Sequence, residues 1–251
     1  MSEGGWRSGG VRFLSAGTTP PGLVAVASCH DHRPLWFTEA EVTCGEYLAF
    51  LNDPDTLAEV DASAAPTRYP REAGNAVAGG YWPRGEDGRF RLPEGWSPGR
   101  PVLGVSFRDA RAYAAWRDAR ARDRGEPFTW RLPTLEELTH LHFTPNVWPY
   151  LHGDAFRPQL FQSCNSRAVP CVEPVMSYPA DESPHGAFDV MGGSSEWCDE
   201  WFDRSRRQRY LVGGAWAYGE PVRFAYAGLR GDGEDAAEDT YGFRLVAEQR
   251  E

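Results

Sequence analysis

The sequence predicts an α+β fold, rich in loops, in which a few short helices accompany twisted antiparallel strands. At Thr43, Ser106 and Thr134 the chain combines a carboxylate three residues on with apolar residues at helical spacing, a pattern typical of helix starts. After residue 143 the chain changes to short runs of Trp, Gly, Pro and aromatic residues bounded by turns, which is typical of strands and ordered loops. We therefore expect helices in the first half and strands in the second.

The size of the chain favours a single domain spanning residues 1–251. Its 251 residues are 41% hydrophobic, enough for a packed core. No stretch reaches the roughly 18 consecutive apolar residues that a membrane span needs. The first residues do not combine a basic start with an apolar run, so we expect a cytoplasmic location by default, with surface display by another route left open.

The first elements follow from the pattern before residue 54. Residues 22–27 are a short apolar run after a turn and predict an edge strand. Thr43 and Glu46 form a capping box, so a helix should begin at Cys44. Its apolar stripe has helical spacing and should face the core through Tyr47, Phe50 and Leu51. Residues 54–100 show no sustained period, and we predict an irregular insertion there.

Two further helices and three strands are predicted beyond the insertion. Ser106 with Asp109 starts one helix, which Gly125 can end, and Thr134 with Glu137 starts the next. The runs RYLVGGAWAY, VRFAYAGLR and YGFRLVAE near the end predict strands of one antiparallel sheet.

Charge and cysteine content narrow the classes of partner. All 26 basic residues are Arg, and the net charge of −10 would repel a phosphate backbone, so we expect no nucleic-acid partner. The five cysteines form no CxxC pair, and small buried thiols are the favoured interpretation. A bridge between Cys164 and Cys171 is the alternative.

Six segments together resemble the formylglycine-generating-enzyme, or sulfatase-modifying-factor, family. They are EVTCGEYLAFLN, PVLGVSFRDARAYAAW, RLPTLEEL, GAFDVMGGSSEWCDEWF, LVGGAWAY and YGFRLV, in order from about residue 36 to 246. The resemblance implies a C-type-lectin-like α+β fold. In the founding oxidases of that family two cysteines bind copper, and the matching positions here hold Tyr218 and Arg223. Neither side chain can replace a thiolate, so copper is not expected.

The family also includes enzymes with an iron held by three histidines and proteins with no known catalysis. Of the six histidines here, His30 with His32 and His140 with His142 are each two residues apart. The second pair lies on a predicted helix and should diverge, so core or surface roles are favoured over an iron site. A metal-dependent oxidase with a divergent site, and a pseudoenzyme interaction module, stay open as alternatives.

The favoured function is ligand binding without catalysis, as in the variable proteins of diversity-generating retroelements. The resemblance places their binding surface before the terminal GFR segment, here between Trp216 and Tyr241, a stretch without Asn. We expect a protein or glycan ligand to contact Trp216, Tyr218, Glu220, Arg223, Phe224, Tyr226, Leu229, Asp232, Glu234, Asp235, Asp239 and Tyr241. The alternative is ordinary loop composition under a GC-rich genome, with the acidic run 231–239 solvated.

A structural calcium ion is implied by the resemblance. The family's calcium loop maps to Asp189, Gly192, Ser194 and Glu196, with Asn165 in a more doubtful second site. The alternative is a tight turn in which Glu196 bonds backbone amides. Arg131 and Arg244 are expected to be structural arginines, and Trp197 and Trp201 to lie in the core.

Overall fold

The computed structural model describes residues 19–28, 31, 33–64, 67–70, 82–143, 149–169, 171–226 and 228–250. The predictions that concern Cys29, His30, His32 and the first 18 residues lie outside these ranges. The elements, in chain order, are β1 (Leu23–Ala27), β2 (Pro34–Thr38), α1 (Cys44–Leu51), α2 (Pro54–Ala62), α3 (Phe107–Asp123), β3 (Phe128–Arg131), α4 (Leu135–Phe143), η1 (Pro158–Leu160), β4 (Ser195–Trp201), β5 (Gln208–Val212), η2 (Pro221–Phe224), β6 (Arg230–Gly233), β7 (Tyr241–Gly242) and β8 (Val246–Gln249).

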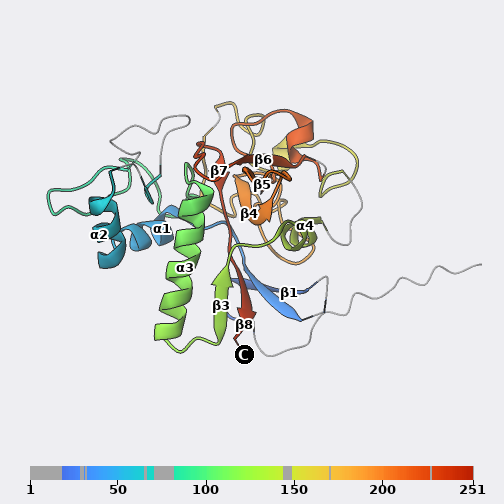
Figure 1. Ribbon diagram of the computed structural model, residues 1–251. Coiled ribbons are helices and arrows are strands. Elements are labelled where there is room, and N and C mark those ends of the chain that lie inside the picture. The colour runs from blue at the N-terminus through green and yellow to red at the C-terminus, as the bar shows by residue number, and fades with distance from the viewer. Residues whose placement is uncertain are drawn as a thin grey trace, which may run out of the picture.

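The described strands form two four-stranded sheets (Figure 1). The first has the order β1-β2-β8-β3, with every neighbouring pair antiparallel, so the late strand β8 lies between two early ones. The second has the order β6-β5-β4-β7, and its β4–β7 pair is parallel. The prediction of an edge strand at residues 22–27 is confirmed, because β1 is the outer strand of its sheet.

The prediction of one antiparallel sheet near the end of the chain is wrong in two respects. The run VRFAYAGLR contains the 3-10 turn η2, and its strand, β6, begins only at Arg230. The run YGFRLVAE splits between the sheets, because β7 pairs with β4 while β8 pairs with β2 and β3. Pro221 lacks the backbone donor that a strand ladder needs, which favours the turn.

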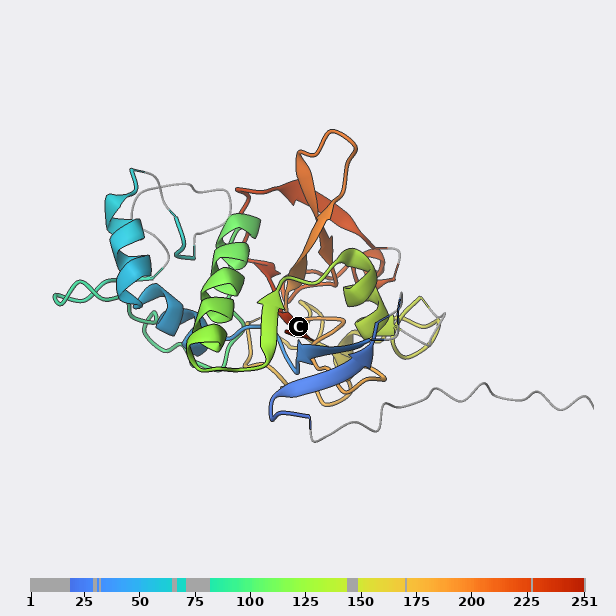
Figure 2. The same ribbon diagram turned by 60° about the horizontal axis from the view of Figure 1, so that its bottom comes forward.

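Three capping boxes start helices where they were predicted. The Thr43 backbone N–H donates to the Glu46 carboxylate at 2.8 Å, and the Thr43 hydroxyl accepts from the Glu46 N–H. Ser106 and Asp109 repeat the arrangement at α3, and the Glu137 N–H of α4 donates to the Thr134 hydroxyl at 3.2 Å. Helices α1, α2 and α3 gather on one side of the molecule and α4 lies on the other, as both views show (Figure 1 and Figure 2).

The prediction that residues 54–100 are irregular is wrong at their start. Helix α2 occupies Pro54–Ala62, with Asp53 as its N-cap and Pro54 in its first turn. The Asp53 carboxylate accepts from the Asp55 N–H at 3.2 Å. Proline at this position sacrifices no hydrogen bond, because the first amides of a helix have no intrahelical acceptor. The proline therefore starts a helix that composition alone had suggested was a loop.

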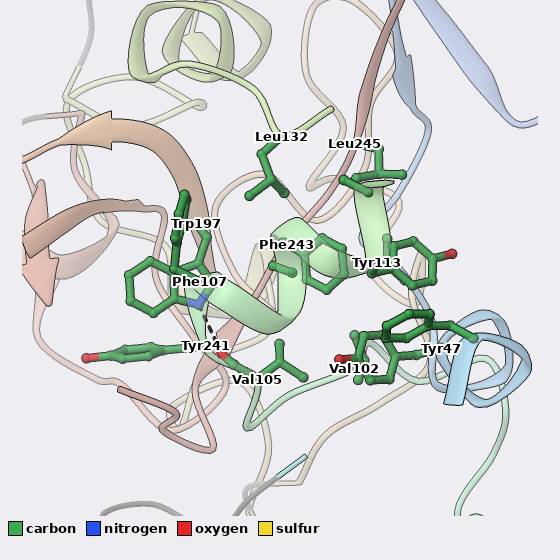
Figure 3. Packing of buried hydrophobic residues seen from close by; sticks show 14 of the residues in the cluster. Tyr47, Val102, Val105, Phe107, Tyr113, Leu132, Trp197, Tyr241, Phe243 and Leu245 are labelled. Carbon is green, nitrogen blue, oxygen red and sulfur yellow. Dashed lines mark hydrogen bonds between the residues drawn. The ribbon is translucent and has the colours of Figure 1, made fainter. Parts of the chain in front are cut away.

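An aromatic core joins the helices to both sheets. In Figure 3, Trp197 of β4 lies over Phe107 and Tyr241, and its indole N–H donates to the Val105 carbonyl at 3.0 Å. Trp197 is fully buried, as predicted. Trp201 is only half-buried, so its predicted core position is wrong. Within the described ranges, no helix combines the length and the apolar character that crossing a membrane would require.

Candidate ligand-binding surface

The segment from Trp216 to Tyr241 leaves the second sheet after β5 and returns to it as β6 and β7. The Trp216 indole N–H donates to the Asp239 carbonyl at 2.8 Å, which joins the beginning of the segment to its end. A Cβ at Gly214 would collide with the ring of Phe224, so the chain can turn closely here only with glycine. The 216–241 segment thus begins and ends at the second sheet. A hydrogen bond joins its two ends, and the close approach of Gly214 to Phe224 holds the chain just before it.

Tyr218 lies between polar groups of the 216–241 segment. Its hydroxyl is 3.0 Å from the Thr240 hydroxyl, and its carbonyl accepts from the Cys164 N–H at 3.0 Å. Two guanidinium groups lie over its ring, Arg223 at 4.3 Å and Arg230 at 5.0 Å from the centroid. The structure therefore brings together the two positions, 218 and 223, that were singled out from the sequence.

Arg230 is a member of this site that the sequence analysis missed. One of its terminal nitrogens donates to the Ser195 hydroxyl and to the Gly213 carbonyl, the latter at 3.2 Å. Its Nε and its other terminal nitrogen are buried and have no hydrogen-bond partner within the described part of the chain. Burial, and then the nearby Arg223, lower its pKa. No local pattern could have identified it, because its neighbours come from distant parts of the chain.

Several predicted contact residues are open to solvent. Tyr226 is 52% exposed and packs edge-on against Phe143, with ring centroids 5.1 Å apart. Glu220 and Asp235 are exposed, and Arg223 is partly so. Val222, which was not predicted, is also exposed beside them in the chain. These side chains can meet a ligand without any rearrangement.

Three other predicted contact residues are not available in the same way. Phe224 is 1% exposed and packs against the Phe161 ring at a centroid distance of 4.8 Å. Tyr241 is buried against Trp197, and Leu229 packs on the core beside Phe224. The prediction of ligand contact at Phe224 and Tyr241 is corrected here, because both rings belong to the core.

The acidic run 231–239 is partly paired rather than simply solvated. Glu234 accepts from Arg209 at 2.9 Å and lies 3.0 Å from Arg108, which also pairs with Asp235. The Arg209 guanidinium is buried over the Trp201 ring, 3.6 Å from its centroid. These pairs fix one side of the run.

A hydrogen bond within the 216–241 segment also holds Asp232 in place. The Tyr241 hydroxyl donates to the Asp232 carboxylate at 2.9 Å. Burial, followed by this hydrogen bond, raises the pKa of Tyr241. The Asp232 carboxylate is therefore already hydrogen-bonded within the fold, and a ligand would have to share it with Tyr241.

The loop predicted to hold calcium leads into β4 of the second sheet. The Glu196 carboxylate accepts from Arg244, with N–O distances of 2.6 to 2.9 Å, so the alternative in which it bonds backbone amides is wrong. Asp189 accepts from the Met176 N–H at 2.6 Å. Arg244 also donates to the Phe188 carbonyl at 2.9 Å, which confirms its predicted structural role. Protein donors thus already occupy Glu196 and Asp189, and an ion would have to displace them.

Two more carboxyls surround Arg244. Glu41 accepts from the Ser194 N–H and hydroxyl at 2.7 and 2.6 Å, and Asp181 accepts from the Met191 and Gly192 amides at 2.9 and 3.0 Å. Burial raises the pKa of Glu41, that of Asp181 to about 8 and that of Asp189 to about 6. We call Glu41, Asp181, Asp189, Glu196 and Arg244 the buried acid cluster. Calcium at residues 189–196 stays a prediction, as does the second site at Asn165, whose amide donates to Gly219.

The described histidines and cysteines lie at different places in the fold, which bears on the predicted metal and disulfide chemistry. His140 lies against His185, with ring centroids 5.3 Å apart, whereas His142 is fully buried and neither of its ring nitrogens is hydrogen-bonded within the described residues. The predicted divergence of His140 and His142 is confirmed. In the described ranges no three His, Cys, Asp or Glu side chains are placed to hold a metal ion. Cys164 and Cys171 are free thiols, so the alternative of a bridge between them is wrong.

Comparison with known proteins supports the fold. Residues 12–249 match the family described as the sulfatase-modifying factor enzyme 1-like domain. Relatives include the formylglycine-generating enzyme of Streptomyces coelicolor, 28% identical over 77% of this chain and 64% of its own length. They also include the inactive C-alpha-formylglycine-generating enzyme 2 of Bos taurus, 30% identical over 59% of this chain and 50% of its own. The hercynine oxygenase of Mycolicibacterium thermoresistibile is 30% identical over 62% of this chain and 33% of its own. The chain thus spans between one third and two thirds of these relatives.

Solved structures share the architecture. PvdO from Pseudomonas aeruginosa superposes with a TM-score of 0.60 at 18% identity, covering 86% of this chain and 81% of its own. The Treponema denticola variable protein 1 gives 0.60 at 15% identity, covering 90% and 94%. At such identities the likeness shows the fold alone, and the predicted α+β, formylglycine-generating-enzyme-like fold is confirmed.

Proposed function

Because the chain belongs to the sulfatase-modifying factor enzyme 1-like domain family, we propose that it is a non-catalytic member that binds a ligand at its C-terminal surface. The observation that carries the proposal is the pair at positions 218 and 223. A tyrosine ring and a guanidinium stack there, 4.3 Å apart, where the founding oxidases have cysteines. Neither group offers a thiolate to copper, whereas an aromatic ring beside a cation suits recognition.

The composition of the exposed surface supports recognition of a protein or a glycan. Tyr226 and Val222 offer apolar area, and Glu220, Arg223 and Asp235 offer charged groups around it. Aromatic faces supply buried area, while the charged neighbours select among ligands. A few such anchors commonly carry most of the binding free energy.

A finer proposal is that residues 216–241 are diversified, as in the variable proteins of retroelements. Its support is compositional, since the segment is rich in Tyr, Asp, Gly and Ala and has no Asn. The shared fold of the Treponema denticola variable protein 1 is compatible with this role but adds no argument about the surface. Sequencing the coding segment in a population of the source organism tests it. Substitutions concentrated at adenine positions of a nearby template copy are expected, and an invariant segment without a template contradicts it.

One observation favours the alternative of an oxidase with a divergent site. Cys164 lies next to Tyr218, because its backbone N–H donates to the Tyr218 carbonyl. Two relatives bear the names of oxygen-using enzymes, although one other is named inactive, which suits the pseudoenzyme alternative.

Metal analysis of the purified chain separates binding protein from oxidase. We expect no stoichiometric copper or iron and no oxygen consumption with thiol substrates after loading with either metal. Cys164→Ser is the matched control, because any thiol-dependent activity centred on Cys164 should disappear in that variant. Stoichiometric copper or iron together with Cys164-dependent oxygen consumption would overturn the proposal.

A further inference from the structure

We infer that the surface around Tyr218 binds an oxyanion group of its ligand, a carboxylate or a phosphate, through Arg230 with Arg223. This inference rests on the proposed binding function and specifies the ligand's chemistry. It starts from Arg230, whose guanidinium uses one nitrogen to reach Ser195 and Gly213. The other two nitrogens of that guanidinium are buried, and within the described residues neither has an acceptor.

Two buried arginines, Arg209 and Arg244, show what Arg230 lacks. Arg244 is paired with Glu196 at 2.6 Å, and Arg209 is paired with Asp199 at 3.1 Å and with Glu234 at 2.9 Å. Among the described residues, no carboxylate lies within ion-pair distance of Arg230. A charge shielded from water without an opposite charge costs folding free energy. The fold carries that cost at Arg230 unless another molecule supplies the opposite charge.

Arg223 adds a second cation to the same place. Both guanidiniums lie over the Tyr218 ring, at 4.3 and 5.0 Å from its centroid, so the two positive charges repel each other. The charged partner of Arg223 is Glu220, 3.6 Å away on the surface. Around Arg230 the facing titratable groups are Tyr218, Arg223 and Tyr241, and none of them is a carboxylate. An oxyanion would relieve both the repulsion and the unpaired donors.

The geometry also gives a route of entry. Arg223 is partly exposed on the single turn η2, and an exposed ion pair such as Arg223 with Glu220 opens easily because water replaces it at little cost. Arg223 can therefore receive an anion at the surface, beside the same Tyr218 ring over which Arg230 lies. The planar fork of arginine donors matches the two oxygens of a carboxylate or a phosphate.

The test is a titration of the full chain with inorganic phosphate and, separately, with acetate, at constant ionic strength balanced by sodium chloride. Thermal midpoints and the ¹⁵N-detected Nε–H signals of arginine are followed, with the Arg230 signal assigned by its loss in Arg230→Gln. We expect a saturable rise in midpoint, a shift of the Arg230 signal, and at least tenfold weaker binding in Arg230→Gln. Arg111→Gln, an exposed arginine on α3, is the matched control and should bind like the unaltered chain.

The outcomes separate the possible sources of the anion and the two proposals. Tighter binding of phosphate indicates a phosphorylated ligand, and tighter binding of acetate indicates a carboxylate. The inference is overturned if neither anion moves the Arg230 signal, or if Arg230→Gln and Arg111→Gln respond alike. It is also overturned if Arg230→Gln unfolds at a much lower temperature without oxyanions, because Arg230 would then be a structural residue. Metal-dependent oxygen consumption would overturn the non-catalytic function while leaving the titration result unchanged.

Discussion

Arg244 is fully buried and Arg230 is partly buried, and the two arginines meet adjacent residues of the same strand in different surroundings. Arg244 pairs with Glu196 of β4, and Arg230 donates to the neighbouring Ser195. Because successive side chains of a strand point to opposite faces, the second sheet has one face with a compensated charge and one face without. The difference indicates that the Arg244 face holds the fold together, whereas the Arg230 face is kept for a ligand.

The largest expected effect concerns the compensated face. Arg244→Met removes the cation from the buried acid cluster and leaves its carboxyls without a counter-charge. We expect a loss of about 3 to 5 kcal/mol in the free energy of unfolding, measured by urea denaturation. Arg230→Met is the matched variant and should lose less than about 1.5 kcal/mol, because it removes hydrogen bonds and the contact with the Tyr218 ring but no ion pair. Equal losses in the two variants would erase the proposed difference between the faces.

The second effect concerns two aromatic residues of the 216–241 segment and compares a structural ring with a ring that faces solvent. Phe224→Ala should cost about 3 to 5 kcal/mol of stability, since the ring is buried against Phe161. Tyr226→Ala, two residues on, should change stability by less than about 1 kcal/mol because its ring is largely exposed. Thermal and urea unfolding of the two variants check this. If Tyr226→Ala proves as damaging as Phe224→Ala, Tyr226 is part of the core and not of the surface.

These variants also mark what could be predicted from the sequence. The capping boxes at Thr43, Ser106 and Thr134 are local, because a side chain three residues away satisfies the helix amide, and all three predictions hold. Phe224 and Tyr226 have the same local setting, yet one is buried and the other exposed. The choice depends on whether a distant ring, here Phe161 or Phe143, meets them.

The sequence analysis missed Arg230 for the same reason, because its partners are distant in the chain. Arg230 and Arg244 each follow an apolar residue in the sequence, and only the folded chain reveals that Arg244 meets a carboxylate. The missed helix α2 is a different case, because Asp53 followed by Pro54 is a local start signal that the surrounding Pro and Ala content obscured.

Calcium is the ion that could break the comparison between the two faces. An ion at residues 189–196 would compete with Arg244 for Glu196. If calcium binds there, a concentration one hundred times its dissociation constant would stabilise the chain by about 2.7 kcal/mol. Unfolding curves in calcium and in a chelator measure the difference. Coincident curves would remove calcium from this loop.

The pH dependence of stability should report on the same cluster. Burial raises the pKa of Asp181 from 3.8 to about 8, so the folded chain keeps a proton there that the unfolded chain releases. This contribution is complete below about pH 4 and is lost as the pH rises towards 8, with a slope of about 1.4 kcal/mol per pH unit. Asp181→Asn should lower the measured slope by that amount between pH 5 and 8, because Glu41 and Asp189, whose pKa values burial also raises, keep their own contributions. A variant with an unchanged slope would mean that Asp181 is ionised in the fold.

The smallest effect is at Tyr218. Tyr218→Phe removes the hydrogen bond with Thr240 and should cost about 0.5 to 1.5 kcal/mol of stability. The ring, and with it the packing of Arg223 and Arg230, is kept, so phosphate and acetate should bind the variant as they bind the unaltered chain. Loss of anion binding in Tyr218→Phe would assign the contact to the hydroxyl instead of to the arginines.

The position of β8 has a consequence for synthesis on the ribosome. Its residues are made after those of every other described strand, yet they fill the gap between β2 and β3 in the first sheet. Until residues 246–249 emerge, two strands with unpaired edges wait in the nascent chain, where such edges can pair with other molecules. The second sheet needs residues only up to 242, so all of its strands are synthesised before the last strand of the first sheet.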